Sequence, residues 1–417
     1  MATDMIKYLN TAVFSGLLNK NIILLISLIF FLCLLLFLCI YLNSKINPCH
    51  CGHIYTIKTK LTKLVSKVKD KFYEKLGFVG MELYKILIHQ KGLLIIIILV
   101  FALQYNSSDE KIYFSDSDYI VNDFYDMYSG ELTQDTKNYI NEWQNKIWNP
   151  EQSIHTFNPN LLISEQKAIS KVINHVDYLE NLKDTKGIEG WLVNPRSYNH
   201  LFGNDYYSKQ IVYDVLALIF LVFALSAVFS YEEKNNVKTV IHTTANGRVK
   251  LFMSKIISVI ILTTIIWGLV YGAQLLEINK HYNFTNLEAP VQSLDFFENI
   301  NIKCSLGDLI FIVSLLRLFV LILISFIICY ISNRVSLIKT IIISIVIFLI
   351  PEFLSNLTIP IFNYISAIRI INVTSVLLVK NGFIIMLIYI AILVVLGLIV
   401  LYKTKKNWCN NKKQKGE

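Results

Sequence analysis

Charged residues and prolines are scarce in this chain. Only 17% of its 417 residues are charged and only seven are proline, whereas 54% are hydrophobic and the mean hydropathy is +0.50. Because a soluble domain carries about 25% charged residues, this composition excludes an ordinary soluble protein. It predicts an all-α polytopic membrane protein whose core lies in the bilayer.

Paired cysteines and catalytic motifs are also missing. The seven cysteines are scattered, which predicts no disulfide framework. The sequence contains no G-x-x-x-x-G-K-[ST] loop, no H-E-x-x-H and no G-x-S-x-G. We therefore expect that the chain is not an enzyme, hydrolyses no ATP through a P-loop and holds no cofactor of its own.

The best candidate for metal binding is the cluster Cys49-His50-Cys51-Gly52-His53. Structural zinc sites usually separate their cysteines by two to four residues and bring a second pair of ligands from elsewhere. Here one residue separates the cysteines, and the sequence offers no second pair. We therefore expect no metal site.

Seven apolar runs approach the length of about 20 residues that crosses a bilayer. The predicted spans are 22–42, 88–105, 211–229, 256–276, 309–331, 340–357 and 383–402. The first run is longer than a signal-peptide core, and no small-residue cleavage site follows it, which predicts a retained anchor.

Basic residues gather on alternate connections between these runs. Residues 43–91 hold ten Lys against three acidic residues, and the tail 403–417 holds six Lys against one Glu, whereas residues 106–210 hold nine basic and 16 acidic residues. Since Lys and Arg near span ends stay on the cytoplasmic side, we expect the N-terminal arm 1–21 outside the cell and the C-terminus in the cytoplasm. The formal charge of +9 then suits anionic lipid headgroups and does not indicate nucleic acid.

The segment 230–255 places a charged, turn-containing pattern between two apolar runs. An acidic pair ends one span, a short amphipathic run and a Thr-rich turn follow, and a Lys opens the next span. These residues are Glu232, Glu233, Lys238, Thr243, Thr244, Gly247, Arg248 and Lys255. This order, with its T-x-x-G-R turn, resembles the coupling loop of the permease subunits of type-two ABC exporters.

A second resemblance to this family lies in residues 78–90, where apolar and charged positions alternate at helical spacing. The piece Glu82-Leu83-Tyr84-Lys85 looks like the entry helix that lies at the inner membrane surface and begins such a permease domain. The similarity covers about residues 78–402, which contain six predicted spans. The additional span 22–42 and the Lys-rich connection 43–77 depart from the family pattern.

The resemblance implies a permease subunit of a bacterial ABC exporter in the cell membrane. A separate ABC ATPase subunit would bind ATP and Mg and dock on segment 230–255, and a second permease subunit would complete the transporter. The implied mechanism is alternating access, with a drug, an antimicrobial peptide or another amphipathic molecule as substrate.

The segment 106–210 is predicted to be an extracellular, mainly helical domain. Thr133 is placed to cap a helix that runs to about Ile147, and Ser164 to cap another through about Leu182 that Lys186-Gly187 ends. Most of its aromatic residues are expected to form its own core. The alternative is an exposed aromatic surface for an amphipathic or peptide substrate.

Three charged residues fall within predicted spans or at their ends, namely Asp214, Arg317 and Glu352. An unpaired charge inside a bilayer costs at least about 2–3 kcal/mol, so each should face a partner or a wet cavity. We expect Arg317 to pair with Glu352 or Asp214. The alternative is that both carboxylates reach the lipid headgroups.

The sequence does not exclude two other classes of function. A non-transporting membrane sensor or scaffold would use the extracellular domain as a receptor and would need no ATPase. A membrane-embedded enzyme would need converging polar groups, whereas the candidates here are scattered single residues.

Overall fold

The computed structural model describes nine stretches of the chain. They are residues 77–108, 115–148, 159–203, 206–234, 237–244, 247–298, 304–356, 366–372 and 382–409. All of them belong to one compact unit, Leu76–Glu417. The predicted arm 1–21, span 22–42 and ligand cluster Cys49–His53 lie outside the described residues, as do most of the connection 43–77 and the end of the basic tail.

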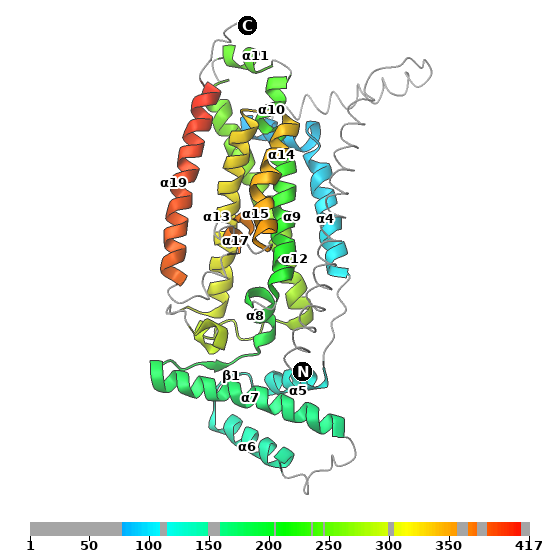
Figure 1. The fold of residues 1–417 in the computed structure, drawn as a ribbon, viewed down its shortest axis with the longest axis vertical. Coiled ribbons are helices and arrows are strands. Elements are labelled where there is room, and N and C mark those ends of the chain that lie inside the picture. The colour runs from blue at the N-terminus through cyan, green and yellow to red at the C-terminus, as the bar shows by residue number, and fades with distance from the viewer. Residues whose placement is uncertain are drawn as a thin grey trace, which may run out of the picture. The chain divides into compact units, whose positions relative to one another are not determined.

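The described residues are mainly helical (Figure 1). The helices are α3 (Phe78–Tyr84), the π-helical turn η1 (Lys85–His89), α4 (Gly92–Ser108), α5 (Asp116–Tyr128), α6 (Gln134–Trp148), α7 (Pro159–Lys186), α8 (Pro195–Phe202), α9 (Tyr207–Leu225), α10 (Ala227–Lys234), α11 (Val237–Thr243), α12 (Val249–Tyr282), η4 (Val291–Ser293), η5 (Asp295–Phe297), α13 (Leu306–Ser332), α14 (Leu337–Phe348), α15 (Ile350–Asn356), α17 (Ala367–Ile371) and α19 (Gly382–Cys409). The strands β1 (Gly130–Glu131) and β2 (Trp191–Leu192) form one antiparallel pair.

Five helical stretches are long and apolar enough to cross a membrane. They are Tyr207–Glu232, Val249–Tyr282, Leu306–Ser332, Leu337–Leu354 and Ile384–Cys409, and the pair Phe78–His89 and Gly92–Asn106 would make a sixth if its two parts, bent by 65°, form one span. The chain is therefore an all-α polytopic membrane protein. These stretches overlap the predicted runs, and most extend past them at one or both ends, because polar residues continue the helices beyond the apolar part.

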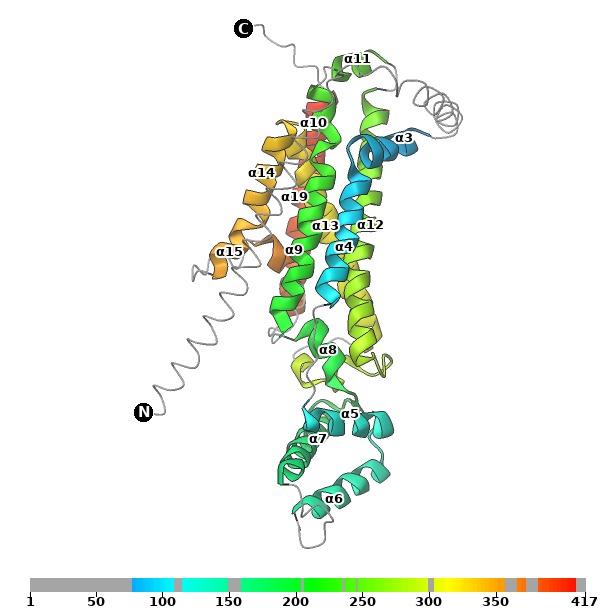
Figure 2. The ribbon, with the colours of Figure 1, turned by 90° about the vertical axis from the view of Figure 1, so that its right-hand side faces the viewer.

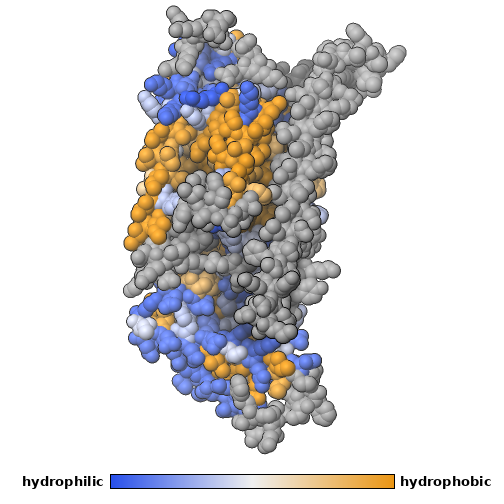
Figure 3. All heavy atoms as spheres, viewed as in Figure 1, coloured by the Kyte–Doolittle hydropathy of each residue, from blue (hydrophilic) through white to orange (hydrophobic). Residues whose placement is uncertain are grey.

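Helix α9 is the most enclosed of these helices, with 78% of its apolar window buried. It packs against α4, α12, α13 and α14, so that neighbours cover several of its faces (Figure 2). By contrast, only 11% of the corresponding window of α19 is buried, since α19 packs mainly on α13. Figure 3 shows hydrophobic surface over the long helices and hydrophilic surface at both ends.

The helix bundle has two ends. The end that carries segment 230–255 is called the loop end, and the end that carries α8 and the connection between α12 and α13 is called the far end (Figure 1). Helix α12 runs from one to the other, and its 34 residues span about 51 Å at about 1.5 Å per residue.

The segment 106–210 is mainly helical in its described part, as the sequence predicts. Thr133 caps α6, because its Oγ1 accepts a hydrogen bond from the backbone N–H of Thr136 (3.3 Å). The predicted start of the next helix at Ser164 is wrong, since α7 begins at Pro159, a residue whose fixed φ suits the first helical turn. It ends at Lys186, just before Gly187, whose φ of 64° favours glycine.

The aromatic residues of this segment contribute mostly to its core. Phe124 and Tyr125 are buried against α7, and the rings of Tyr128 and Trp143 stack on Phe124. Tyr119 is exposed. The prediction of an internal aromatic core is confirmed for these four residues. Tyr113 and Phe114, also expected there, lie outside the described residues.

Helix α7 is fixed to the connection between α12 and α13 by hydrogen bonds. Tyr178 Oη donates to the carbonyl of Gln292 (2.8 Å), and His175 Nε2 lies 2.9 Å from the carbonyl oxygen of Ser293. The backbone N–H of Trp191 donates to Ser293 Oγ (2.9 Å). These contacts join the helical segment to the far end of the bundle as one packed body.

A glycine sets the closeness of α13 and α19. A Cβ placed on Gly397 would lie 2.3 Å from Leu323 Cδ2, whereas a Cβ on Gly268 of α12 would meet nothing within 4 Å. Small residues allow membrane helices to approach closely.

We expect Gly397→Leu to destabilise the protein by about 1–3 kcal/mol through overpacking, measured by unfolding in mixed micelles.

The matched control is Gly268→Leu, which introduces the same side chain into open space and should leave the unfolding midpoint nearly unchanged. Adding Leu323→Ala to Gly397→Leu should restore part of the loss. Equal effects at the two glycines would contradict this account of the α13–α19 contact.

Candidate functional site

Four buried or partly buried charges from four separate elements meet at the loop end. They are Glu82 of α3, Lys85 of η1, Glu232 of α10 and Lys255 of α12. Lys255 Nζ lies 3.0 Å from Glu82 Oε2 and 2.7 Å from Glu232 Oε1. Lys85 Nζ lies 2.7 Å from Glu82 Oε2 and 2.5 Å from Glu232 Oε1. Each lysine therefore bridges both carboxylates, and we call these residues the four-charge cluster.

Lys255 is the centre of this cluster. Its side chain is fully buried, and Nζ also donates to the carbonyl of Val228 (3.1 Å), so that three acceptors surround the three ammonium hydrogens. The ammonium also lies 5.5 Å from the ring centres of Phe229 and Trp408. Cation–π attraction adds to the ion pairs at a desolvated site.

The corner between α3 and α4 brings Glu82 and Lys85 to the cluster. The helix widens into the π-helical turn η1 and then breaks at Lys91, which has a φ of 61°. A Cβ on Gly92 would lie 2.8 Å from the carbonyl oxygen of Ile86, so the corner requires a residue without a side chain there. Gln90 Nε2 donates to the carbonyl of Ala227 (3.3 Å) and fixes the corner to α10. Residues 78–90, predicted to be an entry helix, thus form a short helix with a bent exit, and their role as an entry helix stays a prediction.

The burial of two carboxylates and two ammonium groups has a large desolvation cost. Their mutual attraction offsets that cost only while all four are present, because removal of one partner leaves an uncompensated buried charge. The cluster contains as many positive as negative groups and links α3 and η1 to both sides of segment 230–255. It therefore acts as a rigid joint between these elements.

The remaining loop residues shape the turn between α11 and α12. Thr243 and Thr244 donate their hydroxyl groups to the carbonyls of Val240 and Ile241 (both 2.7 Å) and thereby satisfy the end of α11. A Cβ on Gly247 would lie 1.8 Å from the carbonyl oxygen of Ile241, which explains the glycine.

Arg248 precedes α12, and its Nε donates to the carbonyl of His242 (3.4 Å). Lys238 lies on α11, and its Nζ lies 5.3 Å from the centre of the Trp408 ring. Glu233 lies in α10. Leu83 and Tyr84 lie in α3, half-buried beside Glu82. The structure therefore does not place Lys238, Thr243, Thr244 or Arg248 in the four-charge cluster.

Sequence reasoning missed the role of Trp408. Residues 403–417 were expected to form a basic tail, but α19 continues through Cys409 and buries Trp408 completely. The indole Nε1 donates to the carbonyl of Arg248 (3.1 Å), and the ring meets that of His242 edge to face. A tryptophan in an otherwise basic stretch was the available signal.

A groove opens between α3 and the turn that contains α11, beside the four-charge cluster. Its volume is about 320 Å³. Its walls are mainly apolar, with Phe78, Val237, Ile241 and Leu251, and Lys85 and Glu232 also line it. A mainly apolar wall with a few polar groups is typical of a binding site.

The predicted intramembrane charges lie toward the far end, where Asp214 interacts electrostatically with both Arg317 and Glu352. Glu352 pairs with Arg369 of α17 (3.4 Å) and accepts a hydrogen bond from Ser366 (2.5 Å). Glu352 thus has a partner, Arg369, that was not among those predicted. The sequence gives no sign of this partner, because Arg369 lies between the predicted spans 340–357 and 383–402.

Arg317 is connected to Asp214 through Tyr271 and Gln274 of α12. Arg317 Nη1 donates to Gln274 Oε1 (3.2 Å), and its guanidinium lies 5.0 Å from the centre of the Tyr271 ring. Tyr271 Oη donates to Asp214 Oδ1 (2.6 Å). Arg317 and Asp214 thus belong to one buried polar layer that ties α9, α12 and α13, but neither hydrogen bond joins them directly.

Among the described residues, no group of three or more His, Cys, Asp or Glu is arranged to hold a metal ion. No family model, curated protein or solved structure matches this chain.

The four-charge cluster predicts a strong dependence of stability on Lys255. Lys255→Met should destabilise the protein by about 3–5 kcal/mol, because Glu82 and Glu232 then share one ammonium group in a buried site. The loss is measured by unfolding in mixed micelles. Lys280→Met, an exposed lysine on the same helix, is the control and should have little effect.

The double change Lys255→Met with Glu232→Gln restores equal numbers of positive and negative groups. It should recover a substantial part of the lost stability. A Lys255→Met protein that unfolds like the Lys280→Met control would show that the cluster does not hold these elements together.

Proposed function

We propose that this chain is the permease subunit of an ATP-driven type-two ABC exporter in a bacterial cell membrane. It would move a drug, an antimicrobial peptide or another amphipathic substrate. The observation that carries this proposal is the four-charge cluster, which connects the entry-helix candidate to both sides of the coupling-loop candidate. A loop that receives force from another protein needs such a rigid connection to the membrane helices.

The cluster gives the loop a direct mechanical path into the bundle. Glu232 ends the stretch that contains α9, Lys255 lies in the first two turns of α12, and Glu82 and Lys85 lead through the bent corner into α4. A displacement of α11 would therefore move three long helices together. Since α12 reaches the far end, the displacement would extend across the membrane as a rigid-body movement.

The 320 Å³ groove is the proposed docking place of the ATPase subunit. An apolar side chain of the partner would enter between Phe78 and Ile241, and polar groups at its edge would face Lys85 and Glu232. ATP and Mg would be bound by the ATPase, since this sequence has no P-loop. A second permease subunit, identical or different, would provide the other half of the transport path.

The buried polar layer at Asp214, Tyr271 and Arg317 is the proposed outer gate. Its hydrogen bonds join α9, α12 and α13, so these helices separate only when the bonds are broken or exchanged. In the alternating-access cycle, movement of α12 by the loop would supply the work for this exchange.

The first test is co-purification of a P-loop ATPase with the full chain in mild detergent. We expect a stoichiometric ATPase with the unmodified protein. Ile241→Arg, which places a charge in the groove, should reduce the recovered ATPase by on the order of tenfold, as for a truncated hot-spot contact. Met127→Arg, at an exposed position of α5, is the control and should leave recovery unchanged.

A non-transporting sensor is the second candidate, because α7 is fixed to the far end by Tyr178 and His175. A receptor domain needs such a firm attachment to transmit a signal. Recovery of intact protein without any ATPase would contradict the exporter proposal and favour the sensor.

A further inference from the structure

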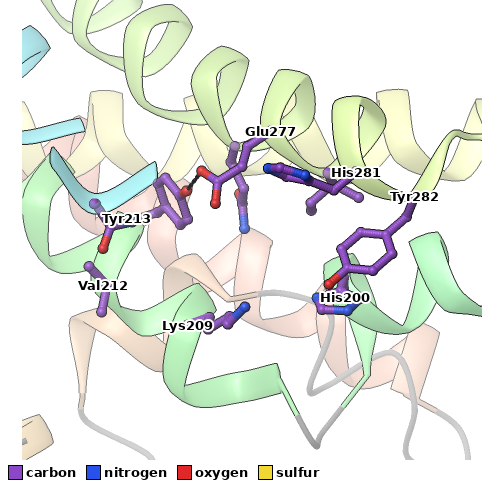
Figure 4. A pocket seen from close by; sticks show the side chains of 10 residues that line it. His200, Lys209, Val212, Tyr213, Glu277, His281 and Tyr282 are labelled. Atoms are coloured by element: carbon purple, nitrogen blue, oxygen red, sulfur yellow. Dashed lines mark hydrogen bonds between the residues drawn. The ribbon is translucent and has the colours of Figure 1, made fainter. Parts of the chain in front are cut away.

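A polar pocket at the far end remains unexplained by the proposed function. It lies where the ends of α4, α9 and α12 meet α8, and its volume is about 60 Å³, enough for several water-sized groups. The side chains that give it chemical character are Lys209 of α9, Gln274, Glu277 and His281 of α12, and His200 of α8 (Figure 4). No part of the four-charge cluster contributes to it.

Charges of opposite sign lie on opposite walls of this pocket. Figure 4 shows Glu277 on α12 facing the cavity from one side and Lys209 on α9 from the other. Tyr213 Oη donates to Glu277 Oε2 and fixes the carboxylate, while Oε1 takes no part in that bond. Glu277 would repel a simple anion and Lys209 would repel a simple cation, so neither kind of ion matches both walls.

His200 lines the pocket with an uncharged side chain. It is buried between the rings of Tyr206 and Tyr282, whose centres lie 3.6 Å and 3.9 Å from its own. Burial, followed by the positive charges of Lys209 and Arg196, lowers the pKa of His200 to about 3. The imidazole is therefore neutral near pH 7, and Lys209 and Glu277 set the formal charges of the pocket, with His281 beside them.

Gln274 adds a hydrogen-bond donor. Arg317 can only donate, so the Gln274 oxygen that accepts from Arg317 Nη1 must face the guanidinium. The amide NH2 is then the part of Gln274 left for the pocket. It lies on the same helix as Glu277, and together with Lys209 it offers N–H donors to an anionic oxygen.

We propose that this pocket binds a zwitterion whose ammonium group and phosphate or carboxylate group are a few bonds apart. Ethanolamine phosphate is an example of this chemistry. The ammonium group bonds Glu277 and lies near the aromatic rings of Tyr213 and Tyr282, and the anionic oxygens take hydrogen bonds from Lys209 and Gln274. This inference does not depend on ATP-driven transport.

The position of the pocket suits a lipid headgroup. Lys209 is the third residue of the stretch Tyr207–Glu232, and Glu277 lies close to the end of Val249–Tyr282, so the pocket is at the level of the span ends. Tyr105 and Leu276, which adjoin the lining residues Asn106 and Glu277 in sequence, are each 72% exposed. Acyl chains could lie along this surface. A free zwitterion shares the same chemistry, and the experiment separates the two sources.

The test uses the purified full chain in phosphatidylglycerol nanodiscs. Phosphatidylethanolamine or free phosphoethanolamine is added, retained lipid is counted by native mass spectrometry, and protection against heat is measured. We expect the zwitterion to be retained in preference to phosphatidylglycerol. Glu277→Gln and Lys209→Gln should each weaken its binding by on the order of tenfold, because each removes a charge-assisted hydrogen bond.

The controls are Glu288→Gln and Lys280→Gln, exposed charges near the same end of the bundle that do not line the pocket. They should leave binding unchanged. Glu277→Gln should also raise the retention of anionic phosphatidylglycerol, a change that a purely structural role would not produce. Lys209 is exposed, so Lys209→Gln is expected to fold even if Glu277→Gln does not.

Stronger protection by phosphatidylethanolamine than by free phosphoethanolamine identifies a membrane lipid as the ligand, and protection of equal size by the two identifies a site for the zwitterion alone. Equal retention of phosphatidylethanolamine and phosphatidylglycerol by the unmodified protein would overturn the proposal. So would a Lys209→Gln protein that folds and binds the zwitterion like the Lys280→Gln control.

Discussion

The fully buried ammonium group of Lys255 is the interaction on which the loop end depends. It has two carboxylates and a carbonyl as acceptors, and these come from α3 and α10 while the lysine itself comes from α12. Glu82 and Lys255 are 173 residues apart, yet neither would be stable alone in an apolar setting. The charges therefore oppose any arrangement that separates these elements, because it would leave a buried charge without a partner.

The two ends of α12 perform different tasks with polar groups. At the loop end, complete ion pairs make a rigid joint. Toward the far end, neutral groups separate the charges, since Tyr271 bonds Asp214 and Gln274 bonds Arg317. Hydrogen bonds of this kind exchange partners at lower cost than a buried ion pair. The loop end of α12 is therefore suited to pass a movement on to the helices bound there. The far end is suited to change its hydrogen bonds during that movement.

Much of the architecture could be predicted from the sequence, because bilayer thickness sets the length of apolar runs and helix caps have a local signature. The long helices and the Thr133 cap are of this kind. Contacts between distant residues were less accessible. Glu82, Lys85, Glu232 and Lys255 were each selected by resemblance, but nothing in their spacing indicated that they would meet. Arg369 was not recognised as the partner of Glu352 because it lies on a short helix without a clear periodic pattern, and Trp408 was overlooked because lysines surround it.

The contact of Trp408 with Arg248 has a consequence for biogenesis. The turn before α12 is completed by a residue from the last described helix, so it cannot reach its final form until α19 has left the ribosome and inserted. Until then Lys255 lacks one of its two aromatic neighbours. The order of synthesis thus delays completion of the loop until all the other described helices have been made. A nascent chain that stalls before α19 would expose the incomplete turn before α12 to membrane quality-control proteases.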